Sequence, residues 1–477
     1  MKKGLAAFLV MLMMFTVPFS FAWSGPGTGG AVFAEAPGKS GSAFDQRIIN
    51  RFNTDRVLEH MTHLVEEIGP RVAGTEEEVL TAEYIQAQLE SFGYDVETQE
   101  FGIPNRVSGE LFTSVSDEEF AIRVAPGSAA TGEEGITGLV VEAGLGYPED
   151  FPEETGGNIA LIERGGMTFW EKTVNAQEAG AAGVIIYDNA ESLVPVTPSL
   201  GGNQADVPVV GITKADGERL IGEGITATLT LSELADQVSP NVIAVKEPKG
   251  KPAENPEIVY VTAHFDSVPY SPGASDNASG TAVVLELARI LKAFPTEKEV
   301  RFVFVGAEEI GLIGSRYYVS QLSEDEIARS AANFNLDMVG TNWEPATALY
   351  VNVVDGAPNQ VWQSASAAAE RLGNDSLVLF ARGASDHVAF YEAGIDAANF
   401  IRREPGTANL EPWYHTPFDT MDKISESRLQ EGGQLIGAAI YDFARKDHPG
   451  RGRSNEAPGR TGVLFNEDER LNMTHHR

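Results

Sequence analysis

The chain has 477 residues, of which 42% are apolar and 22% charged, with a net charge of -34 and no cysteine. This length is too great for one compact core and predicts two domains, while the composition is typical of a globular protein. The acidity disfavours nucleic-acid binding, which needs a basic footprint, and the lack of cysteine excludes disulfides and thiolate metal ligands.

The first residues have the features of a secretory signal peptide. Lys2 and Lys3 precede an apolar run, and small-x-small cleavage candidates end at Ala22 and Ala36. A membrane anchor is the alternative, but the run is short for a span and Gly/Ser-rich sequence follows it directly. We therefore expect a secreted, extracellular protein without stable membrane association after cleavage of the signal.

Two helices and a strand are predicted next. Apolar residues recur at helical spacing over 53–67, and a second helix is expected over 76–92. His60 and His63 lie one turn apart on the first helix. Because no carboxylate is placed near them, they are interpreted as ordinary surface histidines rather than a metal pair. Residues 94–101 alternate in polarity as a strand does.

Between residues 132 and 234 the chain becomes rich in glycine and short strands. Strands are predicted over 159–162 and 184–187, with a helix over 169–179 between them, and no catalytic grouping is present. This part resembles the protease-associated domain, a β-rich module inserted into several peptidases; an unrelated small α/β domain is the alternative. The resemblance rests on Arg164-Gly165, Asn175-Ala176, Ala179-Gly180-Ala181 and Gly183.

From residue 241 onward, apolar strand candidates alternate with helices such as 280–293. The strand candidates are Val242–Val245, Ile258–His264, Val300–Val305, Ala332–Leu336, Leu349–Val353 and Ala397–Ile401. This alternation predicts an α/β fold with a mostly parallel, mixed sheet flanked by helices. The polar tail that follows Arg445 has no periodicity and is expected to be a mobile end.

Ligands of open α/β sheets bind beyond the carboxyl ends of the strands, so functional side chains are expected at those ends. Four predicted strand ends or the loops after them carry imidazoles and carboxylates, and one more carboxylate stands before a helix start. These residues are His264 and Asp266, Glu308 and Glu309, Asp337, Tyr414 and His415, and Asp276.

Imidazole and carboxylate ligands without thiolate favour zinc or a similar first-row ion over magnesium or calcium. Five candidate ligands exceed the three usual at one catalytic zinc and suit two ions that share a carboxylate, for which Asp276 is the natural bridge. Asp266 follows His264 by two residues, so on a strand both side chains project from the same face. The Asp266 carboxylate is therefore expected to accept a hydrogen bond from the ring N–H of His264. Glu308 and Glu309 point apart, so one can bind metal while the other faces the substrate.

The motifs HFDS, GASDNASG, GAEEIGLIGS, NLDMVG and YHTPFDT cover the peptidase half of the chain. Through them the chain resembles the secreted, co-catalytic zinc aminopeptidase family, in particular Bacillus-type leucyl/arginyl/lysyl aminopeptidases with a protease-associated domain. The resemblance implies the zinc-exopeptidase fold, two zinc ions per chain and peptide substrates with a free N-terminus.

The same resemblance implies a role for each site residue. The ligands of one zinc would be His264, Asp276 and Asp337, and those of the other Asp276, Glu309 and His415. Glu308 would be the general base, Asp266 the aspartate that orients the ligand histidine, and Tyr414 a residue that stabilises the oxyanion.

The expected order of parts is a signal peptide (1–36), an N-terminal part of the peptidase domain (37–131), the inserted domain (132–234), the zinc peptidase domain (235–446) and a polar tail (447–477). The preferred N-terminal residue and the oligomeric state stay open, a monomer being expected.

Other functions are weighed against the aminopeptidase. A carboxypeptidase or a glutaminyl cyclase on the same fold is the main alternative. The complete ligand set argues against a non-catalytic, receptor-like binding protein, and the lack of a phosphate-cradling loop argues against a phosphohydrolase. Ser385, Asp386 and His387 invite a serine-hydrolase interpretation, but they do not form a GxSxG elbow and are expected to support the substrate pocket.

Overall fold

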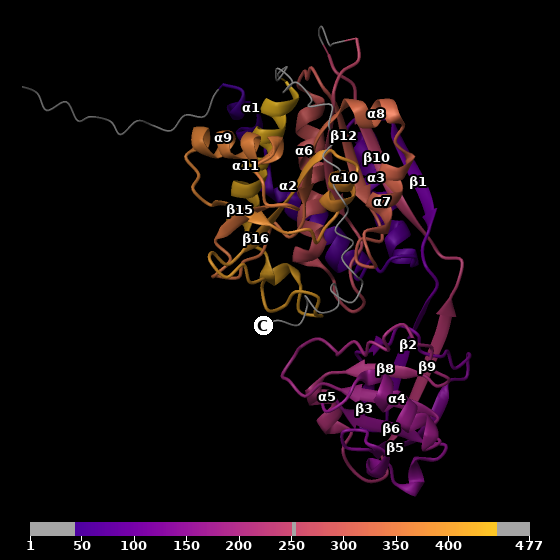
Figure 1. The fold of residues 1–477 in the computed structure, drawn as a ribbon. Helices are drawn as coiled ribbons and strands as arrows, with labels where there is room; N and C mark the ends of the chain where they lie inside the picture. Colours follow the sequence, from indigo (N-terminus) through magenta and orange to yellow (C-terminus); the bar gives the residue numbers. More distant parts are fainter. Residues whose placement is uncertain (1–42, 250–253, 446–477) are drawn as a thin grey trace, which may run out of the picture. The chain divides into compact units, whose positions relative to one another are not determined.

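The computed structural model describes residues 43–249 and 254–445, which contain two eight-stranded sheets (Figure 1). The predicted signal peptide and polar tail lie outside the described residues. Among the helices of the described ranges, none is both long and apolar enough to cross a membrane. All described residues fall within one unit of the chain.

The first sheet is mixed, as predicted. Parallel pairs join β12 to β11, β11 to β13, β13 to β16 and β14 to β15, whereas β1 with β10, β10 with β12 and β14 with β16 are antiparallel. In spatial order its strands are β1 (Val96–Gly102), β10 (Val238–Lys246), β12 (Glu299–Val305), β11 (Ile258–His264), β13 (Ser330–Leu336), β16 (Asp396–Arg403), β14 (Ala348–Val353) and β15 (Leu377–Ala381).

Helices cover both faces of this sheet. One face packs against α1 (Asp45–Ile49), α2 (Thr54–Thr62), η1 (His63–Ile68), α3 (Glu76–Ser91), α6 (Gly280–Lys292), α9 (Gln360–Leu372) and α11 (Glu426–Ala444). The other packs against α7 (Ile313–Gln321), α8 (Glu324–Arg329) and α10 (His387–Glu392). Short turns η4 (Ala274–Ser279) and η5 (Met421–Lys423) complete this part.

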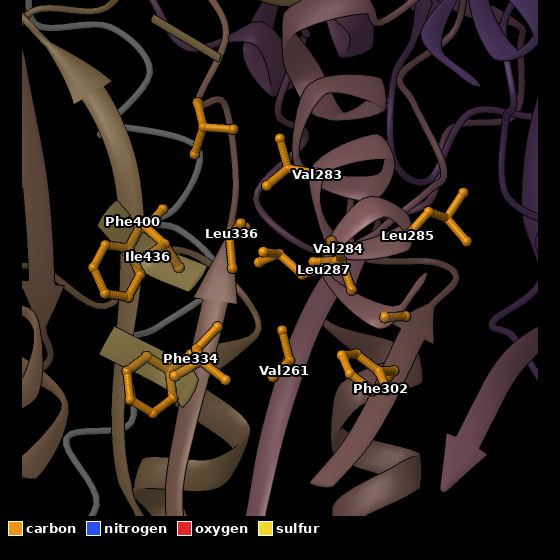
Figure 2. Packing of buried hydrophobic residues seen from close by; sticks show 14 of the residues in the cluster. Val261, Val283, Val284, Leu285, Leu287, Phe302, Phe334, Leu336, Phe400 and Ile436 are labelled. Atoms are coloured by element: carbon orange, nitrogen blue, oxygen red, sulfur yellow. The ribbon is translucent and has the colours of Figure 1, made fainter. Parts of the chain in front are cut away.

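The main core lies between the sheet and the larger set of helices. Every residue of β11 is buried, and alternate side chains enter the two cores: Val259 and Val261 one, Ile258 and Tyr260 the other. Burial on both faces explains the uninterrupted apolar sequence of this strand. Figure 2 shows Val261, Phe302, Phe334, Leu336 and Phe400 from four strands packed with Val283, Val284, Leu285 and Leu287 of α6 and with Ile436 of α11.

The second sheet lies within residues 106–234. In spatial order its strands are β3 (Ser116–Phe120), β2 (Arg106–Thr113), β9 (Thr226–Leu234), β5 (Ile136–Glu142), β6 (Ile159–Glu163), β7 (Gly183–Tyr187), β8 (Val209–Ile212) and β4 (Arg123–Val124). Helices α4 (Phe169–Glu178) and α5 (Lys214–Arg219) and the turns η2 (Pro148–Asp150) and η3 (Glu153–Thr155) belong to it. The sheet thus starts upstream of residue 132, because β2 pairs with β9 over its whole length.

One interpretation from the sequence is wrong. His60 is not a surface residue: it is 4% exposed, and its Nδ1 lies 2.7 Å from the Tyr84 hydroxyl of α3. The periodicity of α2 does not reveal that α3 covers this position. His63 lies nearer the surface, stacks on the Tyr84 ring and pairs with Glu67 at 2.7 Å.

Candidate metal centre

The carboxyl ends of β11 and β13 bring three predicted ligands together. His264 ends β11, and Asp337 directly follows β13. His264 Nε2 lies 3.3 Å from Asp276 Oδ1 and 3.5 Å from Asp337 Oδ1. All three residues are buried. Because β11 and β13 are parallel neighbours, residues that end them necessarily share one edge of the sheet.

A second group forms around the other oxygen of the same aspartate. His415 Nε2 lies 3.0 Å from Asp276 Oδ2 and 3.1 Å from Glu309 Oε2. Asp276 therefore turns one carboxylate oxygen toward each histidine. This is the geometry expected of a carboxylate that bridges two ions, and it joins β11, β13, the segment after β12 and the loop after β16 in one centre.

The donor atoms fit metal ions better than they fit one another. His415 Nε2, Glu309 Oε1 and Asp337 Oδ1 are buried and form no hydrogen bond with any described residue. Tetrahedral zinc with bonds of about 2.0–2.1 Å keeps its ligand atoms about 3.3 Å apart, which is close to the spacings found here. Buried carboxylate oxygens without hydrogen bonds are costly, and cations between them would remove that cost.

Glu308 is the remaining carboxylate at the centre. It also falls within ligand distance of His264 and Glu309, so distance alone would admit it as a third metal group. Burial raises the pKa of Glu308 well above its usual range, and the carboxylates of Asp386, Glu309 and Asp337 raise it further although His264 opposes them. Positive charge nearby is therefore needed to keep Glu308 ionised at neutral pH.

Asp266 differs in its contacts from the sequence-based expectation. The acceptor nearest to His264 Nδ1 is the backbone carbonyl of Asp266 at 3.2 Å, with the carboxylate oxygen at 3.5 Å. The carboxylate instead accepts the backbone N–H groups of Glu308 and Glu309, both at 3.1 Å. Asp266 thus fixes the segment that presents the two glutamates as well as the neighbouring histidine.

Tyr414 lies against the second group. Its ring stacks on the His415 imidazole, with ring centroids 3.7 Å apart and an interplanar angle of 25°. Burial and the surrounding carboxylates, Asp276 first, raise the pKa of Tyr414 well above its usual range. The phenol therefore keeps its proton and can donate a hydrogen bond.

Two further residues position the centre, and neither was assigned a role from the sequence. Asp419 accepts the backbone N–H groups of Ser275 (2.8 Å) and Asp276 (3.0 Å). Asp419 stands inside the YHTPFDT motif, four residues after His415, so the sequence held a signal for it.

The sequence gives no such signal for Arg71. It is fully buried and donates to backbone carbonyls at both ends of the loop between Asp266 and Asp276: Phe265 at 2.7 Å, and Pro272 and Gly273 at 2.6 and 3.0 Å. Gly273 lies in the left-handed region, and a Cβ there would come within 2.7 Å of the Arg71 guanidinium. The Arg71 side chain thus supplies hydrogen bonds that the carbonyl groups of this loop do not receive from backbone N–H groups.

The Ser385–His387 segment does not form a catalytic triad. Ser385 Oγ accepts a hydrogen bond from Asn335 at 2.8 Å, whereas His387 Nε2 faces the carbonyl of Arg382 at 3.0 Å. Asp386 is fully buried and is one of the negative charges that act on Glu308. A supporting role for this segment stays a prediction.

The first sheet, with histidines and carboxylates at its strand ends, and the inserted second sheet define the zinc-exopeptidase fold with a protease-associated domain. Residues 241–440 match the model of Peptidase family M28, and residues 134–220 match that of the PA domain.

Related proteins match the sequence of this chain over most of its length. The chain is 49% identical to aminopeptidase YwaD of Bacillus subtilis over 87% of its own length and 90% of that protein. The chain therefore belongs to peptidase family M28. Among solved structures, BSAP, a zinc aminopeptidase from Bacillus subtilis, matches with a TM-score of 0.72 and 51% identity, covering 84% of this chain and 97% of that one. An aminopeptidase from Aneurinibacillus sp. strain AM-1 matches with a TM-score of 0.61 and 38% identity, covering 84% and 96%.

Proposed function

We propose that this chain is a metallo-aminopeptidase that removes the N-terminal residue from peptides and uses two zinc ions. The observation that carries the proposal is Asp276, whose two oxygens face two histidines at 3.3 and 3.0 Å. Three relatives or neighbours named above are aminopeptidases, and one of them is a zinc enzyme. The acidic centre suits a substrate that arrives with a free, positively charged amine.

One zinc would be held by His264, Asp276 and Asp337, and the other by Asp276, Glu309 and His415. Bound zinc ions would supply Lewis acidity toward water and toward the peptide carbonyl oxygen. Asp266 orients His264 and the backbone of the two glutamates, as its three contacts allow.

Glu308 is proposed as the general base. Its carboxylate takes a proton from the water that attacks the first peptide carbonyl and then delivers that proton to the leaving amine. The Tyr414 phenol donates a hydrogen bond to the carbonyl oxygen as negative charge develops on it. The substrate α-ammonium group would be held by acidic side chains at the centre.

We also propose the division of the chain expected from its sequence: a signal peptide (1–36) that directs secretion, peptidase segments 37–131 and 235–446, an inserted domain 132–234 and a tail 447–477. The strands β2 to β4 support extending the inserted domain upstream to Arg106, since they pair with its sheet. The secreted protein is expected to act as a monomer.

Metal analysis combined with a substrate panel tests the function. We expect two zinc ions per chain and hydrolysis of aminoacyl p-nitroanilides that chelator abolishes, with no action on amino-blocked peptides. One zinc ion at full activity would contradict the dinuclear site. Hydrolysis from the carboxyl end, or cyclisation of N-terminal glutamine, would replace the aminopeptidase by another activity of this fold.

Two substitutions test the roles. Glu308→Gln should keep both zinc ions and lose activity by at least about 100-fold, the size expected for a general base; near-full activity would remove Glu308 from that role. Asp276→Ala should empty the site more completely than Asp337→Ala or Glu309→Ala. Retention of two zinc ions by Asp276→Ala would refute the bridge.

A further inference from the structure

Glu78 carries a fully buried carboxylate in the first turn of α3. Its Oε2 accepts the backbone N–H of Gly74 at 2.6 Å, so this oxygen reaches back over the start of its own helix. Its Oε1 accepts the Ser239 hydroxyl of β10 at 2.7 Å and the backbone N–H of Ala307 at 3.2 Å. The second oxygen therefore ties α3 to a residue that is remote in sequence and directly precedes Glu308.

Three consecutive backbone N–H groups after β12 are accepted by buried carboxylates. Glu78 accepts the first, from Ala307. Asp266 accepts the next two, from Glu308 and Glu309, with one oxygen each at 3.1 Å. Asp266 therefore does not act alone on the segment that carries the two glutamates, because the residue before them is held by a second carboxylate from another part of the chain.

Ala307 has a φ of +54°, in the left-handed region that is costly for a residue with a Cβ. This angle relates two planar peptide groups. The peptide group after Ala307 is held twice: its carbonyl accepts the N–H of Ile313 at 3.1 Å, and its N–H, that of Glu308, donates to Asp266. The peptide group before Ala307 is held at its N–H by Glu78. Loss of the Glu78 acceptor would therefore release the turn on which the position of Glu308 depends.

The backbone beside this carboxylate is shaped to receive it. A Cβ on Gly306 would lie 2.6 Å from Glu78 Oε1 and 2.4 Å from Ser239 Oγ. The glutamate side chain thus occupies the space that a side chain at position 306 would need. The start of α3 requires only the contact to Gly74, so the contacts to Ser239 and Ala307 indicate a second role.

We propose that Glu78 is a positioning residue for peptide hydrolysis: through the N–H of Ala307 it holds the turn from which Glu308 reaches the attacking water. This inference rests on the proposed role of Glu308 as general base and deepens it. In this role Glu78 acts only through Glu308. A general base must lie within hydrogen-bond reach of the proton it takes, so a small displacement lowers the rate of the chemical step more than it weakens substrate binding.

The test variant is Glu78→Gln, which keeps the shape of the side chain. Its amide nitrogen should face Ser239, whose hydroxyl can accept a hydrogen bond, rather than the N–H of Gly74, which cannot. The variant therefore keeps the contact at the start of α3 and loses the acceptor for Ala307. With both proteins loaded to the same zinc content, kcat for an aminoacyl p-nitroanilide should fall about 10- to 100-fold, while KM changes by less than about threefold.

A second substitution tests the turn itself. Ala307→Gly removes the Cβ that makes the left-handed conformation costly, so the turn depends less on Glu78. In the Glu78→Gln background it should raise kcat about fivefold or more. The melting temperature should not recover in parallel, because the substitution also removes a buried methyl group and gives the unfolded chain more freedom.

Two control variants separate positioning from stability. Glu76→Gln makes the same substitution at an exposed position in the same first turn of α3, and it should leave kcat and KM unchanged. Thr75→Ala removes the side chain that accepts the N–H of Glu78 at 3.5 Å, so it weakens the same helix start but keeps the carboxylate. It should lower the melting temperature and leave kcat within about threefold of the wild-type value.

Four results would overturn the proposal: an unchanged kcat in Glu78→Gln, an effect mainly on KM, no recovery in the double variant, or an equal fall of kcat in Thr75→Ala. If the wild-type protein fails to hydrolyse aminoacyl anilides at all, it is the proposed function that fails. Hydrogen exchange at the backbone of Ala307 then still decides whether Glu78 holds this turn: exchange should be faster in Glu78→Gln than in Glu76→Gln, and equal exchange would show that it does not.

Discussion

Asp276 is held in place by a second buried aspartate. The two oxygens of Asp419 accept the N–H groups of Ser275 and Asp276, and Glu411 accepts the Ser275 hydroxyl at 2.6 Å. The backbone from which Asp276 projects is therefore held by hydrogen bonds to Asp419. This arrangement lets Asp276 divide its oxygens between two histidines without losing its own anchorage.

We predict that Asp419→Asn lowers zinc affinity. The amide keeps nearly the same shape, but only one of its two polar atoms can accept a hydrogen bond, so one backbone N–H loses its partner. Loss of a partner behind a metal ligand typically costs about 10- to 100-fold in metal affinity. Competition with a chelating dye measures this affinity.

The matched control is Asp422→Asn, in the same loop but exposed and paired with Lys423. It should leave zinc affinity unchanged. Equal affinities for all three proteins would show that the hydrogen bonds of Asp419 do not position the centre.

At the scale of elements, α11 packs through glycines. A Cβ on Gly433 would lie 2.1 Å from the Phe52 ring, whereas a Cβ on Gly432 would meet nothing closer than Arg402 Nη2 at 3.8 Å. Both glycines are buried residues of one helix, so they differ in the space beside them rather than in backbone conformation.

These two positions give opposite predictions. Gly433→Ala should destabilise the protein by about 1–3 kcal/mol because Phe52 must move within a packed core. Gly432→Ala should be neutral or stabilise by up to about 1 kcal/mol, since alanine is the better helix former. Denaturant unfolding measures the change in the free energy of unfolding for each variant. A change of the same sign in both variants would refute the packing argument.

The buried histidine of α2 predicts acid sensitivity. Burial lowers the pKa of His60 from 6.5 to about 4, with Arg56 and His63 adding to the effect. Because the folded pKa lies below the unfolded one, the unfolded chain binds more protons between pH 4 and 6.5. The contribution of neutral, buried His60 to the free energy of unfolding is fully present above pH 6.5. About 3 kcal/mol of this free energy is lost as the pH falls to 4.

His60→Gln should therefore narrow the stability difference between pH 7 and pH 4.5. Thermal melts in chelator, to keep metal binding out of the comparison, measure this. His63→Gln, one turn away and partly exposed, is the control and should keep most of the wild-type pH dependence, because burial is the largest cause of the lowered His60 pKa. An unchanged pH dependence in His60→Gln would contradict the argument.

The elements differ in how far their sequence predicts them. Ile258–His264 has the same bounds in the prediction and in the structure, because a central strand buried on both faces is a continuous apolar run. By contrast, β15 (Leu377–Ala381) was not predicted, since it lies at the sheet edge and is only half-buried. Strand-end residues could be gathered into one site because parallel strands end at one edge. Arg71 could not be assigned to this site from the sequence, because its partners are backbone carbonyls that no sequence pattern marks.

At the scale of the whole molecule, negative charge dominates. The net charge is -34, and several of the carboxylates that contribute to it are gathered at the metal centre. Without cations these groups disfavour the folded state by their desolvation and mutual repulsion. Metal binding and folding should therefore be linked, since ions that bind only the folded chain stabilise it.

The linkage has a predictable pH dependence. Burial raises the pKa of Asp419 and of Glu78 to about 8, and that of Glu411 to about 7. Folded pKa values above the unfolded ones mean that the metal-free folded chain binds more protons, so its stability falls as the pH rises toward 8. His415, whose pKa the carboxylates raise to about 10 against the effect of burial, acts in the same direction above pH 6.5.

We therefore expect the melting temperature of the chelated protein to fall by several degrees between pH 6.5 and 8, with each such carboxylate contributing up to about 2 kcal/mol. Zinc should raise the melting temperature, and more so at pH 8 than at pH 6.5, because the ions neutralise the groups that titrate and because zinc ligands bind in their deprotonated forms. Calorimetric scans of chelated and zinc-loaded protein across this interval measure both effects. Asp276→Ala should keep the chelated profile when zinc is added. A melting temperature of the chelated protein that rises with pH would contradict the charge argument, because it would mean that the buried carboxylates are already ionised and compensated by the chain itself.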